Sequence, residues 1–274
     1  MRSWRAGLSA ATIGCLLAAG CAAPDRPHVV VEVHEVTETV TETVAAPPPT
    51  KTRQRTTSTT TSSTARPGTS PAAAALGSLA VKGPDPDAGY GRYMFGQAWT
   101  DDVEIDAGHN GCDTRNDILR RDLTHLRIKP GTRGCVALTG TLRDPYTGRV
   151  IPFDRSSSTR GIQIDHVVAL ANAWRTGAQR LTPDQRQTLA NDPLNLLAVG
   201  SAVNTRKSDG DAATWLPQPS FRCSYAARQI AVKTRYRLWV TPTEKSALQR
   251  TLNSCPEQGL PSARATAVPA LEGN

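Results

Sequence analysis

The sequence predicts an α+β fold, a mainly helical single domain with short strands and two disulfide bonds. The 274 residues suffice for one large or two modest domains. A hydrophobic share of 38% is low for a chain that is packed from end to end, so we expect part of the chain to stay unfolded. Apolar residues recur at helical spacing in several segments and form short β-branched runs in others. Four cysteines lie in the region that we expect to fold.

The first 20 residues are predicted to be an export signal. Arg2 and Arg5 precede an apolar stretch that is too short to span a bilayer and ends in small residues. Because Gly20 is followed by Cys21, the stretch resembles a lipoprotein signal, which predicts a lipid-modified Cys21 as the only membrane attachment. Simple secretion is the alternative. Both outcomes place the protein outside the cytoplasm, as a cell-envelope lipoprotein or a secreted protein.

Residues 21–75 are predicted to be a disordered linker. They are rich in Ser, Thr and Pro and lack aromatic residues, so they cannot bury enough surface to offset the chain entropy. The folded domain is expected over 76–260, followed by a flexible tail over 261–274. Lys and Arg number 32 in the whole chain against 24 Asp and Glu, a surplus that favours polyanionic partners.

Cysteine usage agrees with export. Besides two cysteines in and next to the signal there are four more, an even number that predicts two disulfides in an oxidising compartment. Of the three possible connectivities, the local pairs Cys112–Cys135 and Cys223–Cys255 are favoured. A zinc site is the alternative, but the chain has no C-x-x-C pair to support it.

The first half of the domain should contain a helix and a hairpin. A helix is expected over 111–127, opened by Asp113 or Thr114, because Ile and Leu recur at helical spacing. Segments 134–141 and 149–153 flank the turn-forming residues 144–148 and predict a β-hairpin. The polar run 113–117 is explained by the helix cap and is not assigned to a functional site.

The second half should begin with a strand over 162–168, a β-branched run, and continue as a helix over 169–176. Thr182 and Pro183 open a further helix that Pro193 ends, and 194–199 is a short apolar piece. Ser201 should cap the next helix, another should span 225–238, and Thr241 with Glu244 makes a capping box for the last one. We interpret Trp99, Trp174 and Trp215 as packing residues.

The residues that carry chemistry lie between 165 and 207. Asp165 and the amide oxygen of Asn204 are hard oxygen donors that suit Mg²⁺, with Mn²⁺ as a second choice. His166, next to Asp165, could take the proton from an attacking water. Lys207 follows Asn204 by three residues on one helical face and could meet a phosphate, and Arg206 is a weaker candidate for the same contact. Together these residues predict metal-assisted phosphodiester hydrolysis.

The order Ile164-Asp165-His166-Val167, Asn195-Leu196 and Asn204-x-x-Lys207 resembles the HNH endonucleases, whose motif sits on a ββα-metal finger. The longer sequence over roughly 85–255 is similar to exported HNH proteins related to the carboxy-terminal part of the GmrSD restriction enzyme. The resemblance implies a ββα-metal finger embedded in the mainly helical domain. It also implies that Asp165 and Asn204 bind the metal, His166 is the general base and Asn195 braces the loop that holds the histidine.

Two features depart from that pattern. Asn204 stands where many members have histidine, and the C-x-x-C pairs that hold a structural zinc in many relatives are missing. A further condition is geometric, because neighbouring residues on a regular strand point to opposite faces. Asp165 and His166 can share a site only if the strand ends or bends there, and we predict that it does.

Two functions follow as hypotheses. The first is an extracytoplasmic, metal-dependent endonuclease acting on DNA, with RNA as a second substrate class and little base preference. The second is a basic domain that binds extracellular nucleic acid or an anionic cell-wall polymer without cutting it. The ordered carboxylate, imidazole and amide favour the enzyme, because binding alone would need only Lys and Arg. No protein partner is implied.

Overall fold

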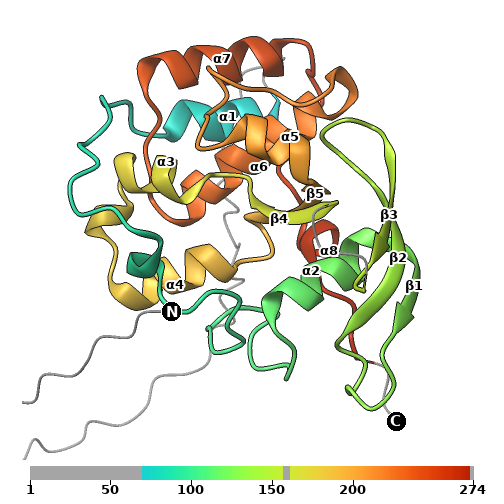
Figure 1. Cartoon of the computed structure of the whole chain (residues 1–274). Helices are drawn as coiled ribbons and strands as arrows, with labels where there is room; N and C mark the ends of the chain where they lie inside the picture. Colours follow the sequence, from blue (N-terminus) through green and yellow to red (C-terminus); the bar gives the residue numbers. More distant parts are fainter. Residues whose placement is uncertain (1–69, 157–160, 272–274) are drawn as a thin grey trace, which may run out of the picture. The chain divides into compact units, whose positions relative to one another are not determined.

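The computed structural model describes residues 70–156 and 161–271 (Figure 1). The expected export signal, the lipid site at Cys21 and almost all of the expected linker lie outside these residues. Within the described part of the chain, no helix combines the length and the apolar character needed to cross a bilayer.

A three-stranded antiparallel sheet is formed by β1 (Leu123–Ile128), β2 (Ala137–Arg143) and β3 (Val150–Asp154), in that order. The hairpin expected from the turn residues is β2–β3. The helix expected over 111–127 is wrong from Leu123 onward, because α2 (Thr114–Asp122) stops and β1 follows at once. Residues 123–128 pair along β2, and this long-range partner overrides their helical spacing.

A second, two-stranded sheet pairs β4 (Ile162–His166) antiparallel with β5 (Leu196–Gly200). The short apolar piece expected over 194–199 is therefore mainly a strand. Between the two strands the chain forms α3 (Leu170–Arg175), η2 (Ala178–Arg180) and α4 (Pro183–Asn191). Helix α5 (Ser201–Lys207) follows β5 without a loop, so a pair of antiparallel strands leads directly into a helix.

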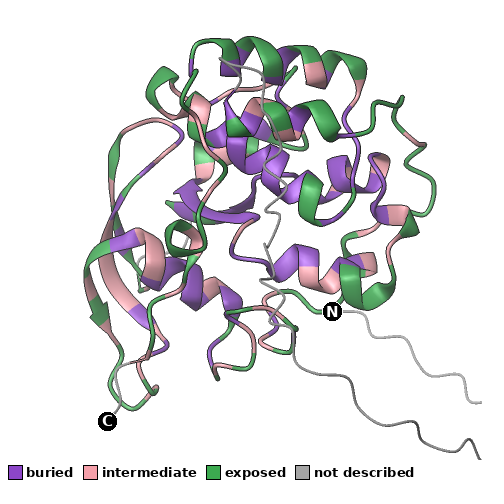
Figure 2. Cartoon of the chain, turned by 180° about the vertical axis from the view of Figure 1, so that it is seen from behind, coloured by how far each residue is buried: buried purple, intermediate pink, exposed green. Residues whose placement is uncertain are grey.

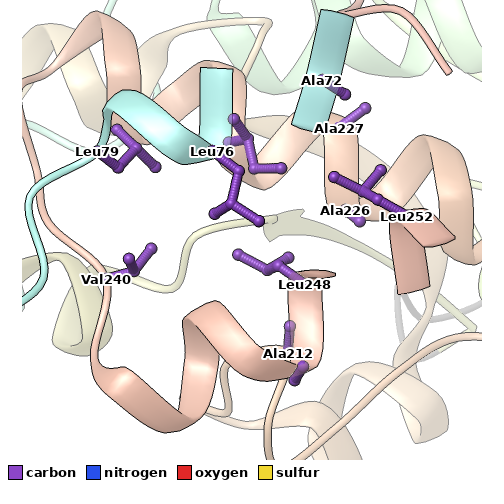
Figure 3. Packing of buried hydrophobic residues seen from close by; sticks show 11 residues of the cluster. Ala72, Leu76, Leu79, Ala212, Ala226, Ala227, Val240, Leu248 and Leu252 are labelled. Atoms are coloured by element: carbon purple, nitrogen blue, oxygen red, sulfur yellow. The ribbon is translucent and has the colours of Figure 1, made fainter. Parts of the chain in front are cut away.

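The remaining helices form the other side of the domain. Helices α6 (Arg222–Arg235) and α7 (Pro242–Asn253) pack with α1 (Pro71–Ser78) around Leu76 and Leu248, which are both fully buried (Figure 3). Helix α1 begins five residues before the expected start of the domain. The Ser70 side chain caps α1, and Leu76 gains a buried position in the cluster, so the packing extends the fold into the Ala-rich stretch.

The short elements are η1 (Arg92–Phe95), η3 (Pro219–Phe221) and α8 (Ala263–Thr266). Helix α8 lies in the segment that we expected to be a flexible tail. Beyond it, the carbonyl oxygens of Pro269 and Ala270 accept hydrogen bonds from the buried Arg120 guanidinium. These bonds attach the segment after α8 to helix α2.

Buried residues concentrate in β4, β5 and α6 (Figure 2). All five residues of β5 are buried. One apolar cluster joins α2, the inner face of the three-stranded sheet and the strands β4 and β5, and includes Ile118, Leu142, Phe153 and Ile164. This packing holds α2 against β5 and against the strands β1 and β2.

Both expected disulfides are formed. Cys112–Cys135 joins the segment before α2 to the connection between β1 and β2, and Cys223–Cys255 joins the start of α6 to the residues after α7. The pairing is the local one that the even cysteine count and the sequence spacing favoured.

Candidate functional site

The candidate site is at the end of β4, where Asp165 and His166 are adjacent. His166 is the last residue of the strand, opposite Leu196 of β5. The two side chains have different surroundings, as alternation along a strand requires. Asp165 contacts residues of the cluster around Tyr146 and Tyr225, whereas His166 lies beside Trp99 and Ala190.

Both oxygens of the Asp165 carboxylate accept hydrogen bonds from buried side chains. The Tyr146 hydroxyl donates to Oδ2 at 2.5 Å, and the Lys207 ammonium donates to Oδ1 at 3.0 Å. Burial raises the pKa of Asp165 above its ordinary value, and the charge of Lys207 with the bond from Tyr146 opposes that increase. Burial and the neighbouring Asp165 also raise the pKa of Tyr146. Tyr146 therefore stays a neutral donor.

Lys207 lies in the interior. Only 2% of its surface is exposed, and its ammonium also donates to the main-chain oxygen of His166 at 2.9 Å. We expected Lys207 to face a phosphate, but the structure places its charge against Asp165 instead. Arg206, the other candidate for a phosphate contact, is exposed and does not line the cavity described below.

The His166 ring is fixed on one edge and one face. Nε2 lies 2.9 Å from the carbonyl oxygen of Ala190. Because a carbonyl can only accept, Nε2 carries the proton and Nδ1 keeps a free lone pair. The Trp99 ring stacks on the imidazole with centroids 5.9 Å apart and planes 18° apart. Burial lowers the pKa of His166 to about 3, so the imidazole is neutral in the free protein.

Asn195 has the contacts of a residue that holds the loop after β4. Its Oδ1 accepts from the Val168 amide at 2.9 Å, and its Nδ2 donates to the Val168 carbonyl at 3.3 Å. The main-chain oxygen of Asn195 also accepts from the Val167 amide at 2.7 Å. These bonds fix the peptide groups that directly follow His166. Asn195 is fully buried, so it acts on the site through this loop.

A cavity of about 440 Å³ connects Asp165, His166 and Asn204. Asn204 reaches it from α5, and its Nδ2 donates to the Gln163 side chain on β4 at 2.8 Å. Arg92 from η1 and Arg115 from the first turn of α2 line the same cavity. The three expected site residues are thus brought to one cavity that also carries two guanidinium groups.

Four residues of this site were not assigned from the sequence. The sequence predicts Tyr146 as part of a turn, Trp99 as a packing residue and Arg115 as part of a helix cap. It gives no signal for Arg92. Trp99 has a positive φ of 60°, a left-handed conformation that is uncommon for a bulky residue and is found at constrained sites. No local signal identified these residues, because each comes from an element far from 165 in the chain.

The cavity offers few protein donors to a divalent ion. No group of three or more His, Cys, Asp or Glu side chains that could hold a metal occurs among residues 70–156 and 161–271. Mg²⁺, however, keeps several waters and needs few protein ligands. Each oxygen of Asp165 accepts a hydrogen bond from a side chain, a carboxylate oxygen has two lone pairs, and Asn204 supplies an amide oxygen. These oxygen donors fit a hydrated divalent ion. The Lys207 ammonium competes with such an ion for the Asp165 carboxylate.

The fold and the site define a class, a disulfide-linked α+β domain in which two antiparallel strands and a helix position an Asp-His pair in a cavity lined by two arginines and two aspartates. The family described as "GmrSD restriction endonucleases, C-terminal domain" matches residues 113–251. The chain belongs to this family, which indicates a nuclease-type function.

One relative comes from Arthroderma benhamiae and is described as "Uncharacterized secreted protein". It is 38% identical over 192 residues, which cover 69% of this chain and 87% of the relative. No solved structure matches the chain at a significant level.

Proposed function

We propose that this chain is a metal-dependent endonuclease of the HNH type that hydrolyses phosphodiester bonds of DNA, with RNA as a second substrate class. The single observation that supports this most is the cavity shared by Asp165, His166 and Asn204. The elements around it have the order of a ββα-metal finger, with β4 and β5 as the strands and α5 as the helix. Helices α3 and α4 are then an insertion between the strands.

Asp165 and Asn204 would hold the divalent cation, Mg²⁺ or Mn²⁺. When bound, this ion would supply Lewis-acid polarisation of the scissile phosphate. Tyr146 and Lys207 orient the Asp165 carboxylate through one hydrogen bond to each oxygen. An oriented carboxylate loses less entropy when it takes a ligand, which is the benefit of a preorganised site.

His166 would act as the general base. Its Nε2 proton is committed to the Ala190 carbonyl, so the lone pair on Nδ1 can accept a proton from the attacking water. Asn195 holds the two residues that follow the histidine, and Trp99 covers one face of the ring. These contacts keep the imidazole in one tautomer and one orientation.

Arg92 and Arg115 would bind the phosphate. Both line the cavity, and no carboxylate lies within ion-pair distance of either one in the described chain. A guanidinium group matches the geometry of two phosphate oxygens. They replace Lys207 in the role that we expected from the sequence, because Lys207 is committed to Asp165.

The protein would work outside the cytoplasm. The expected export signal, the two disulfides and the secreted relative from Arthroderma benhamiae support this location. We propose a lipid anchor at Cys21, with secretion of a free protein as the alternative. The support for this anchor is the pair Gly20-Cys21 at the end of the expected signal.

The test is nicking of supercoiled plasmid by the purified protein in Mg²⁺ or Mn²⁺, compared with excess EDTA. His166→Ala should lower the rate by a factor of 10² or more, as is typical for loss of a general base, roughly 10²–10⁴. His109→Ala is the matched control, because His109 is an exposed histidine that lies outside both the cavity and the sheet β1–β2–β3. Nicking that persists in EDTA, or an unchanged rate in His166→Ala, would contradict the proposal.

Retention of plasmid without any cutting would favour the non-catalytic binding domain. That outcome is measured by a gel shift on the same samples. Cleavage of RNA is tested with a single-stranded RNA oligonucleotide under the same conditions.

A further inference from the structure

We infer that the outer face of the sheet β1–β2–β3, with its two connecting turns, is a second nucleic-acid contact surface outside the cavity. We call this surface the sheet face. It rests on the proposed function in one respect, because the substrate would be the same polyanion. Charge and exposure support this role, and no residue of the sheet β1–β2–β3 lines the cavity.

The register of the sheet separates its two faces. Leu123, Leu142 and Ile151 share a line across the three strands and point inward, toward α2 and β4. The neighbouring line, Thr124 with Thr141, points outward, because successive side chains alternate across a strand. The pair Arg127–Thr139 lies on the same outer face, and Arg143 follows Leu142 and therefore also points outward.

The sheet region carries most of the positive surplus of the domain. Residues 76–274 contain 25 Lys and Arg against 19 Asp and Glu, a surplus of 6. Residues 123–155 alone contain 6 against 2, a surplus of 4 in 33 residues. Of the two acids, Asp144 is fully buried and bonded to Thr147, while Asp154 is exposed on β3, opposite Thr139 on the outer face.

Five cations of this region are exposed and share one property: none has a carboxylate within ion-pair distance among the residues that the structure describes. They are Arg127, Lys129, Arg133, Arg143 and Arg149. Elsewhere on the domain, some exposed arginines have acidic partners, as Arg180 has Asp85 and Arg235 has Asp192. Others, such as Arg237 and Arg250, have no ion pair among the described residues, so the sheet region differs by how many such cations it brings together. An exposed group of cations without counter-charges favours a polyanion.

The side chains between these cations favour the nucleic-acid backbone over a protein. Thr139 and Thr141 place hydroxyl groups between the arginines, and hydroxyls with guanidinium groups are common phosphate contacts. The aromatic residues of the segment, Tyr146 and Phe153, are both buried, so no aromatic ring is available for stacking on bases. We therefore assign to the sheet face phosphate contacts that are independent of base sequence.

The test measures binding of a fluorescent DNA duplex in EDTA at several NaCl concentrations, so that hydrolysis plays no part. The test variant is Arg127→Gln/Arg143→Gln. The control is Arg237→Gln/Arg250→Gln, which removes the same charge from exposed arginines outside the sheet. Each phosphate contact contributes about 0.9 to the slope of log K against log salt concentration. The test variant should lose about 1.8 of that slope, and the control should keep it.

Equal slopes in the test variant and the wild type would overturn the inference. A test variant that loses binding to polyglutamate but keeps the DNA slope would overturn the choice of nucleic acid as the partner. Cleavage of a small phosphodiester, bis(p-nitrophenyl) phosphate, should be equal in the wild type and both variants. If the wild type does not cleave that compound or plasmid, the proposed activity fails while the slope still decides the role of the sheet face.

Discussion

The Lys207 ammonium lies 3.0 Å from Oδ1 of Asp165, and both side chains are buried. Lys207→Met would leave the carboxylate buried without its counter-charge, which costs about 3–5 kcal/mol in comparable cases. We expect a loss of that order in the free energy of unfolding, measured by urea denaturation near pH 7.

The second half of this test is a double-mutant cycle. Asp165→Asn in the Lys207→Met protein should restore part of the stability, because no charge is then buried. If the effects of the two substitutions simply add, the ion pair does not couple α5 to β4 as described.

Trp99 stacks on His166, which predicts an effect on rate. Trp99→Ala should lower kcat by about 10- to 100-fold, since small displacements of a catalytic group have effects of this size, whereas Trp99→Phe should retain most of the activity. Tyr93→Ala is the control, because Tyr93 is 77% exposed and belongs to the same segment. An equal loss in Trp99→Ala and Tyr93→Ala would show that stacking on the imidazole is not the cause.

Asp117 predicts a pH dependence of stability. Burial raises its pKa to about 6 from 3.8, despite hydrogen bonds from Asn110 and Arg120. The folded state therefore favours the protonated form. The stabilising contribution is fully present below about pH 4 and is lost as the pH rises through about 6.

The comparison that isolates this contribution uses Asp117→Asn, which stays neutral at every pH. The free energy of unfolding of the wild type, minus that of Asp117→Asn, should fall by on the order of 1–3 kcal/mol between pH 4 and pH 7. Chemical denaturation at four pH values measures it. A difference that does not change with pH would rule out a raised pKa.

The two disulfides should contribute similarly to stability and differently to activity. They close segments of 23 and 32 residues, for which loss of chain entropy gives roughly 3–4 kcal/mol each. Cys112 lies directly before the helix that carries Arg115, so Cys112→Ala/Cys135→Ala should also lower the nicking rate.

Cys223→Ala/Cys255→Ala is the matched comparison, because this pair joins α6 to the end of α7 and does not line the cavity. It should lose stability and keep kcat at a temperature where both variants are folded. Equal losses of kcat would mean that the first disulfide does not position the cavity.

Elements with local signals were predictable. The helix starts expected at Thr182 and at Thr241 are the starts of α4 and α7. The capping box expected for Thr241 with Glu244 is present, and α4 has one as well, between Thr182 and Gln185. The hairpin β2–β3 and both disulfides were likewise expected from nearby residues. Residues 123–128 were not, because their spacing suits a helix and only the distant partner β2 makes them a strand.

The order of Asp165, His166, Asn195 and Asn204 was readable because these residues follow one another within a short stretch, and the family is recognised by that order. The orientation of the Lys207 side chain could not be predicted from the sequence. A side chain three residues after Asn204 was expected to share its face, but packing turns its ammonium inward to Asp165.

The sequence by itself determined the helices with strong caps, the disulfide pairs and the residues of the motif, since these depend on neighbours along the chain. Only the tertiary structure decided that Tyr146 and Lys207 hold Asp165, that Trp99 covers His166 and that Arg92 and Arg115 line the cavity. The physical reason is that these contacts join separate elements, and their partners are set by how the apolar faces of α2, β4 and β5 pack.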